Sequence, residues 1–133
     1  MGFTATGDLL LRSWDETTFS EEDGIKLTRS TIRYVFEGDV EGSGLKEYVM
    51  AYRSDESTTF VGLEHVVGRI GDRKGTFVLH HTGELDGEQA TVEFTVVPGS
   101  GTGELAGLTG KGGFVAKHSD SGNAAYRFDY DFE

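Results

Sequence analysis

Glu64 is the acidic residue whose surroundings are best suited to proton chemistry, because it occurs in an apolar, strand-like segment, 59–68. On a strand it shares its face with two apolar residues and two glycines that would leave space around it: Phe60, Gly62, Val66 and Gly68. Burial there would favour the protonated acid, which could exchange a proton with a ligand near neutral pH. The opposite facing, with Val61 and Leu63 inside, is more apolar, so periodicity leaves both orientations of Glu64 open, as well as a purely structural role.

His81 is the second candidate for acid/base chemistry. It shares strand parity with Phe77 and Leu79, whereas the adjacent His80 must point to the opposite face. An inward, neutral imidazole could relay a proton or orient a carbonyl group. The alternative is a histidine that only hydrogen-bonds a neighbour. Because neighbouring strand residues diverge and no ligand spacing is visible, we expect no metal site.

Several other classes of site are excluded by composition or context. The chain has 133 residues and no cysteine, which removes thiolate nucleophiles, disulfides and Cys-based metal centres. The segment Gly101-x-Gly103-x-x-Ala106 looks like a dinucleotide fingerprint, but glycines follow where its helix should run. Gly99-Ser100-Gly101 lacks the spacing of a nucleophile elbow. We therefore expect neither a cofactor nor a hydrolase triad.

Strands with period-two alternation must position these residues, since helical spacing is hard to find anywhere in the chain. The C-terminal segment is the clearest case, with four aromatic residues on one face and four charged residues on the other. Eight strand-like segments are predicted: 3–12, 26–41, 45–53, 59–68, 74–83, 88–97, 111–117 and 126–132. Gly42-Ser43-Gly44 is predicted to form a hairpin turn between the second and third. One helical turn is expected near residues 104–108.

Eight regularly spaced strands favour an all-β fold, either a closed antiparallel barrel or a sandwich. Glycines occur inside the strands, for example Gly62 and Gly68, where they cost packing unless the sheet bends sharply. Because barrel corners need such bends, we predict an eight-stranded antiparallel closed barrel formed by one domain, residues 1–133. Its interior would be lined mainly by the following aromatic and apolar residues, which are our candidate ligand contacts: Tyr34, Phe36, Tyr48, Met50, Tyr52, Phe77, Phe94, Phe128 and Tyr130.

Four segments together resemble a bacterial domain of unknown function, the one numbered 3224. They are Trp14-Asp15-Glu16, Phe60-Val61-Gly62-Leu63-Glu64, the segment 75–83 (Gly-Thr-Phe-Val-Leu-His-His-Thr-Gly), and the glycine-rich segment 97–108. The resemblance covers nearly the whole chain, from about Gly2 to Phe132. It implies a barrel similar to those of allene oxide cyclases and dirigent proteins. Dirigent proteins have a glycine turn similar to Gly101-Thr102-Gly103. Those proteins steer ring closure or coupling of a reactive, mostly apolar molecule. The chain lacks a cysteine and an obvious acidic-amide pair on one strand, so the cyclase's catalytic residues cannot be transferred to it.

Three hypotheses for function follow from these observations. In the first, the barrel is a cofactor-independent isomerase or cyclase, with Glu64 or His81 as acid/base and Tyr34, Tyr48 or Tyr52 as hydrogen-bond donors. In the second, it binds or carries a small hydrophobic molecule without turnover. In the third, the interior is packed and outward apolar residues form an oligomer interface: Val35, Val49, Val61, Leu63 and Val97.

The net charge and the apolar runs bear on partners and location. Lysine plus arginine number 12 against 23 aspartates and glutamates, giving a formal charge of −11 that disfavours nucleic-acid binding. Apolar runs are far shorter than the roughly 20 residues that span a bilayer, and no secretory signal is visible. We expect a cytoplasmic protein, a homo-oligomer (dimer or trimer) that binds a small hydrophobic molecule.

Overall fold

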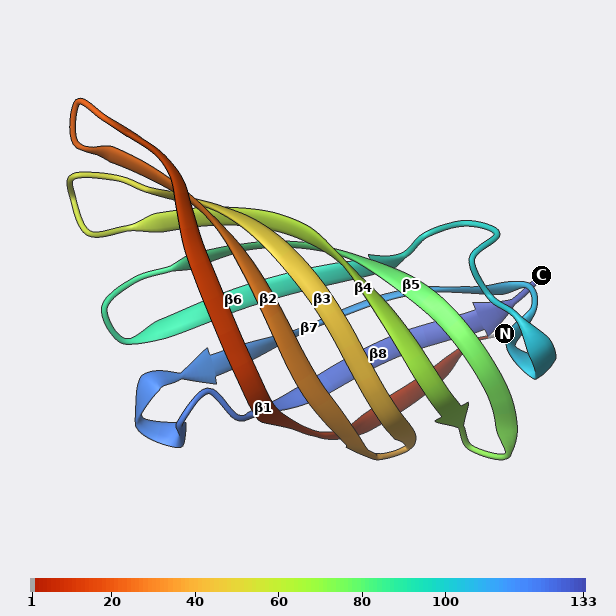
Figure 1. Cartoon of the computed structure of the whole chain (residues 1–133). Coiled ribbons are helices and arrows are strands. Elements are labelled where there is room, and N and C mark those ends of the chain that lie inside the picture. Colours follow the sequence, from red (N-terminus) through yellow and green to blue (C-terminus); the bar gives the residue numbers. More distant parts are fainter. Residues whose placement is uncertain (1) are drawn as a thin grey trace.

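The computed structural model describes residues 2–133, which form eight β-strands and two short 3₁₀ helices (Figure 1). Most strands are long enough to run from one end of the molecule to the other. In chain order the elements are β1 (Phe3–Glu22), β2 (Ile25–Gly38), β3 (Val40–Tyr52), β4 (Thr58–Ile70), β5 (Arg73–Leu85), β6 (Gln89–Val96), η1 (Gly103–Leu105), β7 (Leu108–Lys117), η2 (His118–Asp120) and β8 (Ala124–Phe132).

Each strand pairs in antiparallel fashion with the next, and β1 also pairs with β8, so the sheet closes on itself. The predicted all-β, eight-stranded antiparallel barrel is confirmed, and the sandwich is ruled out. Closure through β1 and β8 gives an interior face to alternate residues of the strands. In the described part of the chain, no helix has the length and apolar character to cross a membrane.

The first strand is much longer than predicted. Two irregularities interrupt the alternation of its side chains, so a period-two pattern does not extend through its second half. The register with β2 shifts between Leu11 and Ser13, and again between Thr18 and Ser20. Each shift places one extra residue in β1 and reverses which parity faces inward. The prediction that this strand ends at Arg12 was therefore wrong. Beyond the first bulge, β1 and β2 continue as a hairpin that projects from the left end of the barrel in Figure 1.

The predicted turn at Gly42-Ser43-Gly44 was also wrong. These residues lie inside β3 and pair with Phe36, Val35 and Tyr34 of β2, while the reversal occurs at Asp39. Gly42 faces Gly68 of β4, and a Cβ on Gly42 would lie 2.2 Å from the carbonyl oxygen of Val67. The glycine permits close contact of β3 and β4 at a bend of the barrel, so here its role is packing.

The remaining strands agree with the predicted segments to within three residues at each end, and the helical turn is η1. The connection from β6 to β7 folds over the right-hand end of the barrel in Figure 1, where Leu105 is fully buried.

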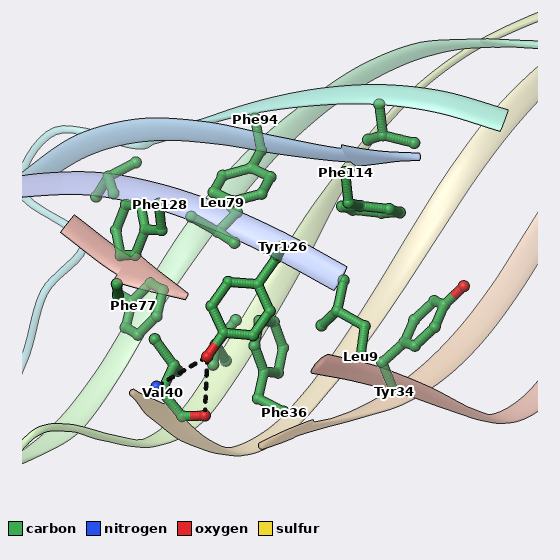
Figure 2. Packing of buried hydrophobic residues seen from close by; sticks show 14 of the residues in the cluster. Leu9, Tyr34, Phe36, Val40, Phe77, Leu79, Phe94, Phe114, Tyr126 and Phe128 are labelled. Carbon is green, nitrogen blue, oxygen red and sulfur yellow. Dashed lines mark hydrogen bonds between the residues drawn. The ribbon is translucent and has the colours of Figure 1, made fainter. Parts of the chain in front are cut away.

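Tyr126 closes the interior near the same end. Its hydroxyl accepts a hydrogen bond from the Val40 amide at 2.9 Å and lies 3.3 Å from the Val40 carbonyl oxygen (Figure 2). The same hydroxyl lies 3.0 Å from the Glu37 carbonyl oxygen, to which it donates. This end of the barrel is filled by side chains.

Candidate functional site

A cavity of about 560 Å³ opens at the other end of the barrel. Turns β5–β6 and β7–β8 border it, together with β1. Its wall is mostly apolar and aromatic, and it includes side chains from seven of the eight strands: Leu11, Trp14, Tyr34, Lys46, Tyr48, Met50, Phe60, Leu85, Ala90, Val92, Phe114 and Ala116. The interior is therefore packed at one end and open at the other.

Trp14 belongs to this wall because of the first bulge in β1. Parity counted from Leu9 and Leu11 would place position 14 outside, but the extra residue at the bulge brings Trp14 opposite the fully buried Ile32. The side chain remains 41% exposed, and its indole nitrogen donates to the Glu16 carboxylate at 3.0 Å. Trp14 thus lies at the rim and is the only tryptophan in the chain.

Lys46 is the charged residue of the cavity wall that lies deepest, with only 2% of its surface exposed. Its ammonium nitrogen lies 4.3 Å from the ring centre of Tyr34, 4.9 Å from that of Tyr48 and 5.0 Å from that of Phe114. Such a cage stabilises a cation through the negative faces of the rings. Among residues 2–133, no side chain or backbone group hydrogen-bonds the Lys46 nitrogen, and no carboxylate lies within 4.0 Å of it.

Glu64 and His81 form a buried pair beside Lys46. Strand pairing places Glu64 directly opposite Lys46, and His81 opposite Gly62. The Glu64 Oε1 atom lies 2.9 Å from His81 Nε2, and His81 Nδ1 lies 3.3 Å from the Tyr48 hydroxyl. Glu64 and His81 are each 1% exposed, so both side chains point into the barrel. Tyr48 connects this pair to the cavity wall.

The charges in this cluster follow from burial and mutual attraction. Burial lowers the pKa of Lys46 to about 8, and the Glu64 carboxylate opposes part of that shift. Burial by itself would raise the pKa of Glu64, but Lys46 and the His81 hydrogen bond together hold it below 4.5. Burial also lowers the pKa of His81, and the Lys46 charge adds to that effect. At neutral pH the cluster therefore holds a predominantly cationic lysine, a carboxylate and a neutral imidazole.

These protonation states assign the direction of each hydrogen bond. An ionised carboxylate only accepts, so His81 Nε2 carries the proton and donates to Glu64. A neutral ring then has an accepting Nδ1, and the Tyr48 hydroxyl donates to it. The resulting relay runs from Tyr48 through His81 to Glu64. Within the described chain, Glu64 Oε2 is a buried polar atom without a hydrogen-bond partner.

Gly44 provides the space that the Glu64 carboxylate occupies. A Cβ at this position would lie 2.0 Å from Glu64 Oε2 and 3.0 Å from Phe36. Because real Cβ contacts are never that short, any larger residue here would push the carboxylate away from His81. The glycine that the sequence pattern assigns to a turn is thus part of the wall around the buried acid.

The predicted ligand contacts divide into three groups. Tyr34, Tyr48 and Met50 line the cavity. Phe36, Phe77, Phe94 and Phe128 are buried but pack against one another and Tyr126 deeper in the barrel, as the labelled rings in Figure 2 show. Tyr52 and Tyr130 are half-buried: Tyr52 donates to Glu16 on the projecting hairpin, and Tyr130 stacks on Phe3 at 5.4 Å. Glu64 and His81 do not line the cavity; they are buried next to Tyr48 and Lys46, which do.

The sequence pattern did not identify Lys46 or the position of Trp14. Lys46 has the parity of Tyr48 and Met50, which was the available signal, but lysines on strands ordinarily face solvent. The outward positions of Val49, Val61 and Leu63, all at least 44% exposed, agree with the predicted parity. Among residues 2–133, no three His, Asp or Glu side chains come together as a potential metal site.

Fold and site define a small up-and-down β-barrel that is packed at one end, open at the other, and has a buried Lys, Glu and His cluster between. The family described as "Protein of unknown function (DUF3224)" matches residues 5–130, and the chain belongs to this family. The predicted family is thereby confirmed. A solved structure of a DUF3224 protein of unknown function from Shewanella oneidensis MR-1, at 1.84 Å resolution, is 29% identical. The match covers 100% of this chain and 99% of that chain, with a TM-score of 0.80. Among curated proteins, none matches significantly.

Proposed function

We propose that the barrel binds a small, mostly apolar molecule whose single polar group contacts Lys46. The observation that carries this proposal is the cavity itself, which has an apolar wall and one deeply buried cation. Its volume of about 560 Å³ falls within the range of about 300–1,000 Å³ that is typical of small-molecule sites. Apolar walls supply affinity in such sites, and a few polar groups fix the orientation of the ligand.

The charge balance of the cluster narrows the polar group that a ligand would present. Lys46 and Glu64 already compensate each other, so a neutral acceptor such as a hydroxyl or carbonyl oxygen adds no uncompensated charge. Such an oxygen would accept a hydrogen bond from the Lys46 ammonium, whose N–H groups have no acceptor within the described chain.

Binding can be measured through Trp14, because the only tryptophan of the chain lies at the cavity rim. Octanol is a suitable probe since it is neutral, apolar along its chain and transparent where tryptophan absorbs. We expect a saturable change in tryptophan fluorescence as octanol is added. Ala116→Phe fills the cavity and should abolish the change, whereas Val115→Phe, on the neighbouring exposed position of β7, should retain it. A signal that does not saturate, or that survives Ala116→Phe, would refute binding in the cavity.

A second candidate function is isomerase or cyclase chemistry, which the resemblance noted in the sequence implies. The chain of hydrogen bonds from Tyr48 through His81 to Glu64 supports it. Tyr48 lines the cavity, and the other two residues can orient its hydroxyl and exchange a proton with it. In this version Tyr48 would be the catalytic residue, and His81 and Glu64 positioning residues. Octanone in heavy water provides a test: an isomerase should accelerate deuterium uptake beside the carbonyl, and Tyr48→Phe should remove that acceleration while octanone still binds. A carrier would give no acceleration.

A further inference from the structure

Lys46 has surroundings that differ from those of an ordinary buried lysine. Buried ammonium groups are normally paired with a carboxylate or several carbonyl oxygens, because three N–H donors must otherwise remain unsatisfied. Here the nitrogen lies among three aromatic rings at the cavity floor, and within residues 2–133 it has neither a hydrogen bond nor a carboxylate within 4.0 Å. A ligand that enters the cavity therefore meets an amine that has no hydrogen bond or ion pair to break within the described chain.

We propose that Lys46 forms an imine with the carbonyl carbon of an apolar aldehyde or ketone bound in the cavity. This inference rests on the proposed function, since it requires that a ligand occupy the site. It goes further by naming the substrate class, carbonyl compounds, and the covalent bond that Lys46 makes. Apolar, desolvated pockets are the surroundings in which lysines act as nucleophiles.

The fraction of neutral amine supports the proposal. With its pKa lowered to about 8 by burial, roughly a tenth of Lys46 is unprotonated at pH 7. For a lysine with the ordinary pKa of about 10.4, the neutral fraction at the same pH is less than about a thousandth. Lys46 thus has on the order of a hundred times more nucleophilic amine than a solvent-exposed lysine.

The reaction can be completed without an added oxidant, reductant or metal. The nitrogen lone pair of Lys46 attacks the carbonyl carbon, a C–N bond forms, and the carbonyl electron pair moves to oxygen, which takes up one proton from nitrogen. The carbinolamine then loses its C–O bond as the nitrogen lone pair forms C=N, and the oxygen leaves as water with the second proton from nitrogen. The proton that the ammonium group released when it became the neutral amine returns to the nitrogen and gives the protonated imine. The Tyr48 ring faces the Lys46 nitrogen and its hydroxyl hydrogen-bonds His81, so Tyr48 is the nearby hydroxyl through which these protons would pass, once the carbonyl oxygen of the ligand lies against it.

Because of the nearby Glu64 carboxylate, imine formation at Lys46 is more favourable than binding of an anionic ligand to the Lys46 ammonium. A protonated imine carries the same charge as the ammonium group that it replaces, so the balance with the carboxylate opposite Lys46 on β4 is unchanged. A carboxylate ligand would instead add a second negative charge beside a buried one, which low-dielectric surroundings disfavour. The cluster is accordingly suited to a neutral carbonyl ligand.

The test is reductive trapping of the wild-type protein with octanal and cyanoborohydride at pH 7, followed by peptide mapping. The chain has four other lysines, Lys26, Lys74, Lys111 and Lys117, which serve as internal controls, and Lys117 is the sharpest because it borders the cavity mouth. With limiting octanal we expect Lys46 to be modified at least about tenfold more than any of these, given its larger neutral fraction. Modification of the surface lysines with Lys46 unmodified would overturn the proposal.

Further arms separate this inference from the proposed function. If octanol changes the Trp14 fluorescence but octanal leaves Lys46 unmodified, imine formation is wrong and binding stands. If neither compound produces a saturable change, both proposals fail. Octanoate that binds at least as tightly as octanal would also contradict the carbonyl preference. Lys46→Met should abolish modification at position 46 while the other lysines react as before, and the wild-type peptide map decides the question even if this variant does not fold.

Discussion

The interaction between Lys46 and Glu64 can be tested by a double-mutant cycle that uses Lys46→Met and Glu64→Gln. Both replacements keep approximately the original shape and remove one charge, and glutamine can still hydrogen-bond His81. The two residues lie opposite each other on β3 and β4 without a direct ion-pair contact, and both are almost fully buried. Each single variant leaves one buried charge without compensation, whereas the double variant leaves neither.

The expected coupling energy follows from Coulomb's law, with the charge separation taken as about 5 Å, because the two side chains start from directly opposite strand residues. Two unit charges about 5 Å apart at an effective dielectric constant of about 20 attract each other by about 3 kcal/mol. Each single variant should lower the free energy of unfolding by about 3–5 kcal/mol, the usual cost of leaving a buried charge unpaired. The double variant should then be more stable than the sum of the single effects predicts, by about 3 kcal/mol.

Urea unfolding of the wild type and the three variants gives the required free energies of unfolding. Urea is uncharged, so it does not screen the interaction between the two charges. The exposed pair Arg69 and Glu41, whose atoms are 2.6 Å apart, provides a matched control on the same two strands. There a cycle of Arg69→Met and Glu41→Gln should give a coupling below about 1 kcal/mol, because solvent screens exposed charges. Additive effects at Lys46 and Glu64, within about 0.5 kcal/mol, would refute the charged state assigned to the buried cluster.

The remaining predictions concern space, hydrogen bonding and pH. Gly44→Ala should destabilise the protein by about 2–4 kcal/mol through its clash with Glu64, measured by urea unfolding, whereas Gly87→Ala, which meets open space, should be nearly neutral; equal effects would contradict the packing argument. Tyr126→Phe leaves a buried amide unpaired and should cost about 1–2 kcal/mol in the same assay, so an unchanged stability would contradict the role of its hydroxyl. Burial holds the pKa of His81 below its ordinary 6.5, so the unfolded chain takes up a proton first as the pH falls. Stability should therefore decrease as the pH falls below about 6.5, and His81→Gln should reduce this decrease; a stability that rises on acidification would show the shift to be in the opposite direction.

The barrel was predictable from sequence because long alternating segments and short turns leave few alternatives. The β4 strand shows the limit of that reasoning, since Val61 and Leu63 make its outer face as apolar as its inner one. The facing of Glu64 depends on neighbours that alternation does not reveal: Gly44 leaves room for the carboxylate, and His81 hydrogen-bonds it. Both come from other strands.

Lys46 and Trp14 show two further reasons why the candidate site was only partly predictable. A buried lysine violates the ordinary preference of its residue type, and it is tolerated here because three rings and Glu64 stabilise the charge. Trp14 follows a bulge, and one inserted residue changes which side chains of β1 face inward. Lys46 shares the inward parity of its neighbours, but much of what stabilises its charge lies on other strands, and the bulge before Trp14 is visible only in the pairing of β1 with β2.

The most direct test of the central claim, that the open end of the barrel is a small-molecule site oriented by Lys46, is a crystal structure of the protein with bromo-octanol, with bromine at the chain end opposite the hydroxyl. Anomalous scattering locates the bromine independently of the rest of the ligand. Bromine is expected near Trp14 at the rim, with the hydroxyl oxygen within hydrogen-bond distance of the Lys46 nitrogen. Bromine bound on the outer face of the barrel, with the cavity wall around Lys46 free of ligand, would contradict the claim.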